Sequence, residues 1–333
     1  MKILYAIQGT GNGHLSRARD VVPALQKKGV KLDILVSGIQ ADIEIPHPVK
    51  YRLKGLSFIF GKQGNVNLWR TYLKANATRL QQEIRSIPIK DYDLVLNDFE
   101  PVTAWACRMQ NKPCIGFSHQ AAVLSALAPK PKKTDRMGKF ILKNYAPTTT
   151  AYGLHFKPYD NRIFSPIIRQ DIRVAKVGTE EHYTVYLPSY SDGRILKVLS
   201  ELSHIKWEVF SKHNANEFVG KNISIRPITN EAFVDSMAKA KGVLCGAGFE
   251  TPAEALYLKK KLMVIPMKGQ YEQQCNAAAL KQMGVPVIKS LKSKHLGKIR
   301  DWLENDRVVE VDYQDQTERI IQQILEEASL ILK

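Results

Sequence analysis

The first segment suited to chemistry is a glycine-rich turn near the N-terminus, GTGNGH at residues 9–14. Gly9, Gly11 and Gly13 let the backbone bend sharply and expose N–H groups beside the start of a helix, which favours a phosphate or another anion. His14 ends the turn where a side chain points over the carboxyl edge of a sheet, the place where open α/β sheets bind ligands. A local helix-capping role is the structural alternative for His14.

This turn differs from the dinucleotide-binding fingerprint. That fingerprint needs G-x-G-x-x-G spacing and an acidic residue about 20 positions later. Here the third glycine comes early, the sixth position is His14, and the second predicted strand ends in Ser37 and Gly38. NAD binding is therefore disfavoured.

Two carboxylates follow another apolar run. The segment LVLNDFE, residues 94–100, is typical of a strand that ends in Asp98 and Glu100 before a helix starts. Because the carboxyl ends of parallel strands meet at one edge of a sheet, we expect Asp98 to reach His14, orient its imidazole and stabilise the protonated form. Helix N-capping is the structural alternative for either carboxylate. His119 and Gln120 follow a further predicted strand and reach the same edge, where ligand contact and a structural role are both open for them.

The most specific pattern covers residues 243–279. A strand leads through a GAG turn at 246–248 into a helix, and a second strand leads through a polar loop into another helix. The polar residues of these crossings are Thr251, Glu254, Gln270, Glu272 and Gln273. Amides, carboxylates and carboxamides that converge in this way suit phosphates, a ribose diol and sugar hydroxyls.

The elements that must hold these residues alternate along the chain. Short apolar runs alternate with longer amphipathic stretches, which predicts βαβ units and parallel sheets, hence an α/β fold. The predicted strands are 2–8, 32–37, 53–59, 94–97, 115–118 and 152–156, then 183–187, 207–210, 223–226, 243–245, 262–266 and 285–288. The periodicity weakens after residue 157, so we expect domains at 1–175 and 176–316, with a terminal helix at 317–333 that could pack back on the first domain.

Composition narrows the class of protein. The 333 residues are 44% hydrophobic and 24% charged, as expected of a soluble chain with one large or two ordinary domains. No apolar stretch approaches the roughly 20 residues of a membrane-spanning helix, and the N-terminus lacks a signal-peptide pattern, so we expect a cytoplasmic protein. The cysteines lie in apolar segments without C-x-x-C spacing, so we expect neither disulfides nor zinc; they are Cys107, Cys114, Cys245 and Cys275.

The motifs together resemble those of GT-B glycosyltransferases, similar to the bacterial N-acetylglucosaminyltransferases of lipid-linked muramyl-peptide and to the UDP-glycosyltransferases. In that superfamily a G-x-G-H loop opens the acceptor domain. A G-x-x-T/S-x-x-E block followed by P…(D/E)-Q-x-x-N marks the donor domain. The first occurs at 11–14, and the second at 248–254 with Pro266, Glu272-Gln273 and Asn276. The resemblance implies two Rossmann-like doubly wound domains that face each other across a cleft.

The same resemblance implies roles for the residues. His14 resembles the general base and Asp98 its orienting partner, while Glu254 would bind the ribose and the GAG turn with Thr251 the diphosphate. Where plant members carry a histidine, this chain has Gly246. The expected donor-binding residues are Gly11, Gly13, Gly246, Gly248, Phe249, Thr251, Glu254, Gln270, Glu272 and Gln273, and the expected acceptor-binding residues are Glu100, His119 and Gln120.

The reaction implied by this resemblance is an inverting transfer of a sugar from a nucleotide donor, with UDP as the nucleotide. The sequence has no DxD motif at a strand end, so we expect no metal and no cofactor besides the nucleotide-sugar co-substrate. A nucleotide-sugar hydrolase that uses His14 to activate water is an alternative, because that family has a similar G-x-G-H-x-x-R loop and residues 11–17 are GNGHLSR. A non-catalytic sugar-nucleotide-binding protein is another.

Charge and amphipathicity suggest the acceptor. Lys and Arg number 49 against 32 Asp and Glu, a net charge of +17, which favours partners that carry phosphates. Residues 130–145 hold six basic residues against Asp135, with apolar residues near helical spacing. Such a helix can lie on an anionic membrane, so we expect a membrane-associated or lipid-linked acceptor. An ordinary solvated helix with its apolar stripe in the core is the structural alternative. Nucleic acid is disfavoured because no recognition helix, RNP-like aromatics or zinc module is present. The chain is expected to be a monomer or a homodimer.

Overall fold

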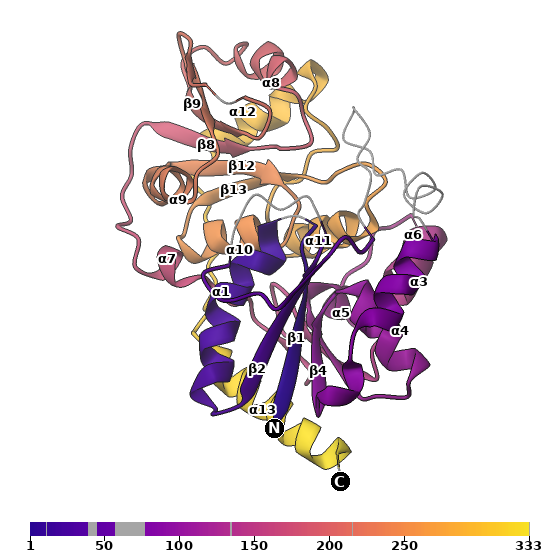
Figure 1. The fold of residues 1–333 in the computed structure, drawn as a ribbon. Helices are drawn as coiled ribbons and strands as arrows, with labels where there is room; N and C mark the ends of the chain where they lie inside the picture. Colours follow the sequence, from indigo (N-terminus) through magenta and orange to yellow (C-terminus); the bar gives the residue numbers. More distant parts are fainter. Residues whose placement is uncertain (11, 39–44, 57–76, 134, 215, 333) are drawn as a thin grey trace.

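Two parallel sheets covered by helices organise the chain, the N-terminal one below and the C-terminal one above in Figure 1. The structure is a computed structural model, and it describes residues 1–333 except 11, 39–44, 57–76, 134, 215 and 333. The α/β class and the two Rossmann-like units predicted from the sequence are confirmed.

The N-terminal sheet has the strand order β3-β2-β1-β4-β5-β6-β7, and all its pairings are parallel. Its strands are β1 (Lys2–Gln8), β2 (Lys31–Ser37), β3 (Tyr51–Leu53), β4 (Leu94–Asp98), β5 (Cys114–Ser118), β6 (Thr150–Leu154) and β7 (Ile163–Phe164). The helices are α1 (Asn12–Lys27), α3 (Ala77–Ser86), α4 (Pro101–Met109), α5 (His119–Leu124) and α6 (Arg136–Tyr145), with the single turn η1 (Ile89–Asp91).

The C-terminal sheet has the order β10-β11-β9-β8-β12-β13, in which only the edge strand β10 runs antiparallel. Its strands are β8 (His182–Tyr186), β9 (Lys206–Ser211), β10 (Phe218–Val219), β11 (Ile223–Pro227), β12 (Gly242–Gly246) and β13 (Lys261–Ile265). The remaining helices are α7 (Gln170–Arg173), α8 (Asp192–Leu199), α9 (Asn230–Lys239), α10 (Glu250–Tyr257), α11 (Tyr271–Gln282), α12 (Leu296–Glu304) and α13 (Thr317–Ile331), with η2 (Ser293–His295).

Most of the predicted strands are found within a few residues of their predicted ends. The predicted strand at 285–288 is instead a single bridge between Val264 and Val287, and part of the one at 53–59 falls outside the described residues. The two-residue strands β7 and β10 were not predicted, because two residues carry no measurable periodicity. The central strands β1 and β5 are buried nearly throughout, as expected of parallel strands covered on both faces, and the edge strand β13 is buried as well.

The topology fixes where a ligand can bind. In the N-terminal sheet the strand order reverses between β1 and β4, and in the C-terminal sheet it reverses between β8 and β12. Open α/β sheets bind ligands outside the carboxyl ends of the strands at such a switch point. The β1–α1 turn and the β4–α4 turn therefore face one such place, and the β12–α10 turn faces the other.

The two sheets are joined through residues 165–181, and the chain then returns to the first domain. The helix α13 lies against α1, where Lys27 and Glu318 form an exposed ion pair with an N–O distance of 2.6 Å. Tyr152 on β6 also donates a hydrogen bond to Glu327. No helix of the described residues combines the length and apolarity required to span a bilayer.

Candidate active site

The imidazole of His14 and the carboxylate of Asp98 meet at the switch point of the N-terminal sheet. Residues Ile7 and Asp98 are paired in the β1–β4 register, so the end of β4 lies beside the turn that carries His14. The Nδ1 of His14 is 2.7 Å from Oδ1 of Asp98. Because a carboxylate only accepts, Nδ1 carries the proton and Nε2 presents its lone pair. His14 is 13% exposed and Asp98 is fully buried, an arrangement suited to a general base.

Arg17 joins this pair from the next turn of α1. Its Nη2 donates to both oxygens of Asp98 at 2.7 Å, and its Nη1 donates to Glu250, the first residue of α10 in the other domain. The side chain is 2% exposed. Arg17 was not among the predicted site residues, although its position three residues after His14 places both on one helix face.

The charges in this cluster set its pKa values. Burial alone would raise the pKa of Asp98, but the charges of Arg17 and His14 outweigh burial and lower it. Burial also opposes ionisation of Arg17, yet Asp98 and Glu250 keep the pKa of its guanidinium above the ordinary value. Burial raises the pKa of Glu250 to about 8, against the opposing effect of Arg17. Arg17 donates two hydrogen bonds to Asp98 and one to Glu250. Asp98 is therefore the carboxylate that stays ionised.

The residue that follows Asp98 has a strained backbone. Phe99, the next residue, has a φ of 56°, a left-handed conformation that costs a side-chain-bearing residue about 1–2 kcal/mol. Its ring packs on Tyr145 with the ring centroids 4.8 Å apart, which helps to hold this conformation. Such strain is typical of functional turns.

Glu100 has a structural position and no free oxygen directed at a substrate. It is the N-cap of α4, fully buried, and it accepts hydrogen bonds from the N–H groups of Val102 and Thr103 at 2.7 and 2.6 Å. The hydroxyls of Ser37 and Thr103 donate to it as well, both at 2.6 Å. Of the two roles considered from the sequence, the structure places Glu100 in the capping role.

His119 and Gln120 also differ from the expected open position, because both are buried in the contact between the domains. His119 stacks on Phe249 with the ring centroids 3.9 Å apart, and its Nε2 is 2.7 Å from Oδ1 of Asn276. Burial lowers the pKa of His119, so the ring is neutral. Gln120 donates to Glu272 at 3.0 Å, and its Nε2 is 3.4 Å from Nε2 of His14.

Glu254 is held by an arginine that the sequence did not indicate. Arg169, just before α7, binds both oxygens of Glu254, with Nε–Oε1 at 2.5 Å and Nη2–Oε2 at 2.9 Å. The Glu254 side chain is 3% exposed. A carboxylate offers about four acceptor positions and the arginine uses two, so Glu254 keeps acceptor capacity for further hydroxyls.

The remaining residues of the predicted donor block surround the end of β12. An added Cβ on Gly246 would lie 3.9 Å from Oε1 of Gln273, and the same oxygen accepts from the N–H of Met267 at 2.8 Å. Gly248 faces open space, because an added Cβ would meet no described atom within 4 Å. Gln270 precedes α11 and its buried Oε1 has no described partner. Thr251 is half-buried in the first turn of α10.

The structure thus brings one predicted group together and leaves one residue untested. His14, Asp98, Gln120 and Glu272 form a continuous chain of contacts across the domain interface. Gly13 lies in the same place, where an added Cβ would be 3.0 Å from Cγ of Glu250. Gly11 lies outside the described residues.

The predicted basic helix is α6. Met137 and Phe140 are 49% and 64% exposed, and the nearby Leu127 is 66% exposed, so these apolar side chains are not part of the core. The exposed cations around them are Lys132, Lys133, Arg136, Lys139 and Lys143. We call these eight residues the α6 patch.

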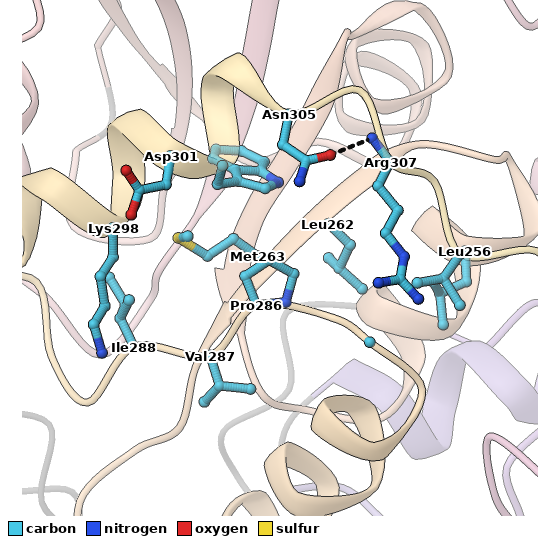
Figure 2. Close-up of a pocket in the computed structure, with 13 residues that line it drawn as sticks. Leu256, Leu262, Met263, Pro286, Val287, Ile288, Lys298, Asp301, Asn305 and Arg307 are labelled. Atoms are coloured by element: carbon cyan, nitrogen blue, oxygen red, sulfur yellow. Dashed lines mark hydrogen bonds between the residues drawn. The ribbon is translucent and has the colours of Figure 1, made fainter.

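A separate cavity of about 300 Å³ lies beside the edge strand β13 of the C-terminal sheet, between this strand and α12 (Figure 2). Met263 of β13, Val287 and Trp302 contribute apolar walls, while Lys298 and Arg307 add positive charge. None of the predicted site residues within the described chain lines it. The switch-point geometry, and not this cavity, marks the candidate active site.

Comparisons with known proteins agree with this geometry. The model of the family Glycosyl transferase family 1 matches residues 1–305. No curated protein matches the chain.

Solved structures share the fold at low identity. UGT89C1 of Arabidopsis thaliana, complexed with UDP, is 15% identical with a TM-score of 0.60, over 98% of this chain and 94% of that one. MurG of Acinetobacter baumannii is 12% identical with a TM-score of 0.55, over 99% and 98%. The glycosyltransferase SnogD from Streptomyces nogalater is 12% identical with a TM-score of 0.54, over 99% and 95%. The chain belongs to Glycosyl transferase family 1, and it is a glycosyltransferase with the GT-B fold.

Proposed function

We propose that this glycosyltransferase moves a sugar from a UDP-linked donor to a hydroxyl of a membrane-associated or lipid-linked acceptor, with inversion and without a metal. The observation that carries the proposal is the His14–Asp98 pair, 2.7 Å between Nδ1 and Oδ1, at the switch point of the N-terminal sheet. The Gly246–Gly248 turn of the donor block lies across the domain interface from it. The complex of UGT89C1 with UDP supports the choice of nucleotide.

In the proposed reaction Nε2 of His14 takes the proton of the acceptor hydroxyl, and Asp98 stabilises the imidazolium. The acceptor oxygen forms a bond to the anomeric carbon from the face opposite the diphosphate, and the bond from that carbon to the diphosphate oxygen breaks, so the configuration inverts. The N–H groups at the start of α10 would receive the charge of the diphosphate. Within the described residues no group of three or more His, Cys, Asp and Glu side chains is placed to hold a metal ion.

The donor half is tested by thermal stabilisation with a panel of nucleotides and nucleotide sugars. A ligand at 100 times its Kd adds about 2.7 kcal/mol of stability. Gly248→Val places a side chain in open space at the donor turn, so it should fold normally and lose the shift with UDP. Gly297→Val is the matched control, since an added Cβ there also meets no described atom within 4 Å. No shift with any nucleotide would contradict a nucleotide donor.

The catalytic half is tested by turnover. His14→Ala should bind UDP as the natural chain does and lose sugar transfer by about 10²–10⁴-fold, the usual contribution of a general base. If the natural chain releases UDP from the sugar nucleotide at the same rate with and without an acceptor, it is a hydrolase instead. Metal dependence is measured by activity in EDTA, where full activity is expected.

The acceptor half is tested by flotation with vesicles that contain anionic lipid. The α6 patch combines exposed apolar and basic side chains on α6 and on the segment that precedes it, a combination that membrane-surface helices also present. Phe140→Asp should lower vesicle binding, and Val174→Asp, on an equally exposed apolar residue outside the patch, should leave it unchanged. Equal loss in both variants, or no binding by the natural chain, would contradict a membrane-associated acceptor.

A further inference from the structure

The cavity beside β13 has apolar walls on segments that backbone hydrogen bonds hold in place. Met263 of β13 and Val287 of the segment after α11 contribute two of these walls. The N–H of Val264 donates to the carbonyl of Pro286 at 3.1 Å, and the N–H of Ile288 donates to the carbonyl of Val264 at 3.2 Å. These bonds fix the segment to the edge strand, so the cavity is preformed, and its volume of about 300 Å³ is at the lower end of the range of small-molecule sites.

Two cations stand at opposite ends of this cavity (Figure 2). Lys298 comes from α12, and Arg307 comes from the segment that follows this helix. Neither cation forms an ion pair within the part of the chain that the structure describes, although Asp301 lines the same cavity. The described hydrogen bond of Arg307 is donated by its backbone N–H, to Oδ1 of Asn305 at 2.8 Å. The guanidinium therefore keeps its five N–H donors for solvent or for an anion.

Gly284 lets the guanidinium of Arg307 lie against the end of α11. An added Cβ on Gly284 would be 2.9 Å from Nη2 of Arg307, so a larger residue would displace this group. Gly284 also has a φ of 95°, which a residue with a side chain rarely adopts. The guanidinium thus borders the cavity even though Arg307 as a whole is exposed.

The indole of Trp302 adds a buried donor to the same wall. Trp302 lines the cavity and is 4% exposed, and its Nε1 has no hydrogen-bond partner among the described residues. A buried donor without a partner costs free energy, because it has lost its bonds to water. An acceptor atom in the cavity would recover this cost.

We propose that this cavity binds a small amphipathic anion, a carboxylate or phosphate ester that carries an apolar ring or chain. Arg307 pairs with the anionic group, in the bidentate geometry that a guanidinium offers to carboxylate and phosphate. The apolar part contacts Met263 and Val287, an acceptor atom of the ligand takes the N–H of Trp302, and Lys298 adds positive charge at the other end.

The proposed site is separate from the donor block. Its wall includes Leu256 and Leu262, near the end of α10 and the start of β13. The donor block uses the opposite ends of the same two elements, where α10 begins and where the loop after β13 leads to α11. The inference therefore does not rest on the proposed function.

The test is an NMR titration of the full chain, with labelled tryptophan, against anilinonaphthalene sulfonate, an aromatic anion. The signal of the Trp302 indole N–H is assigned by its loss in Trp302→Phe. We expect this signal to shift and to saturate at one equivalent of dye. The signal of Trp207 should stay in place, because Trp207 lies in the same core cluster and does not line the cavity.

Charge variants then identify the anion-binding group. Arg307→Gln should weaken binding of the dye by about 10–100-fold, as expected for the loss of a hydrogen bond to a charged group. Arg300→Gln removes the same charge from an exposed position of α12 that does not line the cavity, so it should leave the affinity unchanged. The uncharged analogue phenylnaphthylamine should bind the natural chain more weakly than the sulfonate does.

A Trp302 signal that does not move would overturn the proposal, as would equal affinities of Arg307→Gln and Arg300→Gln for the dye. Equal affinities of the natural chain for the charged and the uncharged dye would show an apolar cavity without anion selectivity, which also contradicts it. If Arg307→Gln does not fold, Lys298→Gln at the other end of the cavity replaces it, with weaker binding expected. The titration contains no nucleotide and no acceptor, so failure of the proposed transfer reaction would leave its result unchanged.

Discussion

Loss of Arg169 tests whether the buried pair with Glu254 holds the donor block to the connection between the domains. The two side chains are 9% and 3% exposed and are joined by two hydrogen bonds, and Arg169 also donates to Asn230 at 2.6 Å. Arg169→Met leaves the carboxylate of Glu254 buried without its cation. Breaking a buried pair from one side in this way costs about 3–5 kcal/mol of unfolding free energy.

The double variant separates this cost from the value of the pair itself. Arg169→Met with Glu254→Leu removes both charges, so it should be more stable than Arg169→Met alone, with a coupling energy of about 2 kcal/mol or more. The assay is urea unfolding followed by tryptophan fluorescence, because Trp207 and Trp302 lie in the core of the C-terminal domain. A loss below about 1 kcal/mol in Arg169→Met, with no coupling in the cycle, would refute the reasoning that this charge is buried and depends on its partner.

Three further predictions concern the cap of α4 and two contacts between the domains. Glu100→Gln replaces one acceptor oxygen in the α4 cap by an NH2 group that faces two donors, so we expect a loss of about 1–3 kcal/mol in urea unfolding and an unchanged KM for the acceptor. A raised KM at full stability would indicate substrate contact. Glu250 has a folded pKa of about 8 against 4.5 in the unfolded chain, so its contribution to stability is fully present below about pH 4.5 and is lost as the pH rises to 8. The melting temperature should fall over this range and fall less in Glu250→Gln, and equal slopes would contradict the assignment. Gly138→Ala would place a Cβ 2.6 Å from Cβ of Tyr271, so a loss of about 1–3 kcal/mol is expected, and an unchanged melting temperature would contradict the close contact of α6 with α11.

The sequence predicted those parts of the site whose residues all follow strands of the N-terminal sheet. His14 and Asp98 follow neighbouring strands, and the rule that strand ends meet at one edge was enough to place them together. Glu100 was ambiguous because a carboxylate after a strand can face a ligand or cap the next helix. The deciding signal was Pro101 at the first helical position, which favours a cap immediately before it.

The parts that the sequence did not predict depend on how the domains meet. Arg17 and Glu250 are 233 positions apart, and no local pattern encodes their contact. Arg169 lies in a segment without periodicity, so nothing marked it as the partner of Glu254. His119 was expected at an open edge, but the stacking of Phe249 on it depends on the same docking of one domain against the other.

The contacts across the interface fall into two kinds. Gln120 with Glu272, and His119 with Phe249 and Asn276, join residues that the resemblance assigns to the acceptor with residues of the donor block. A sugar hydroxyl can donate to Glu272 in place of the Gln120 amide, and such an exchange of one hydrogen bond for another changes the free energy by only about 1 kcal/mol. The contact of Arg17 with Glu250 is different, because neither side chain is assigned to a ligand. It can persist while the donor occupies the turn beside it, and it is the contact that reaches the His14–Asp98 pair. The first kind can therefore yield to substrates, while the second joins the His14–Asp98 pair to the start of α10 through Arg17.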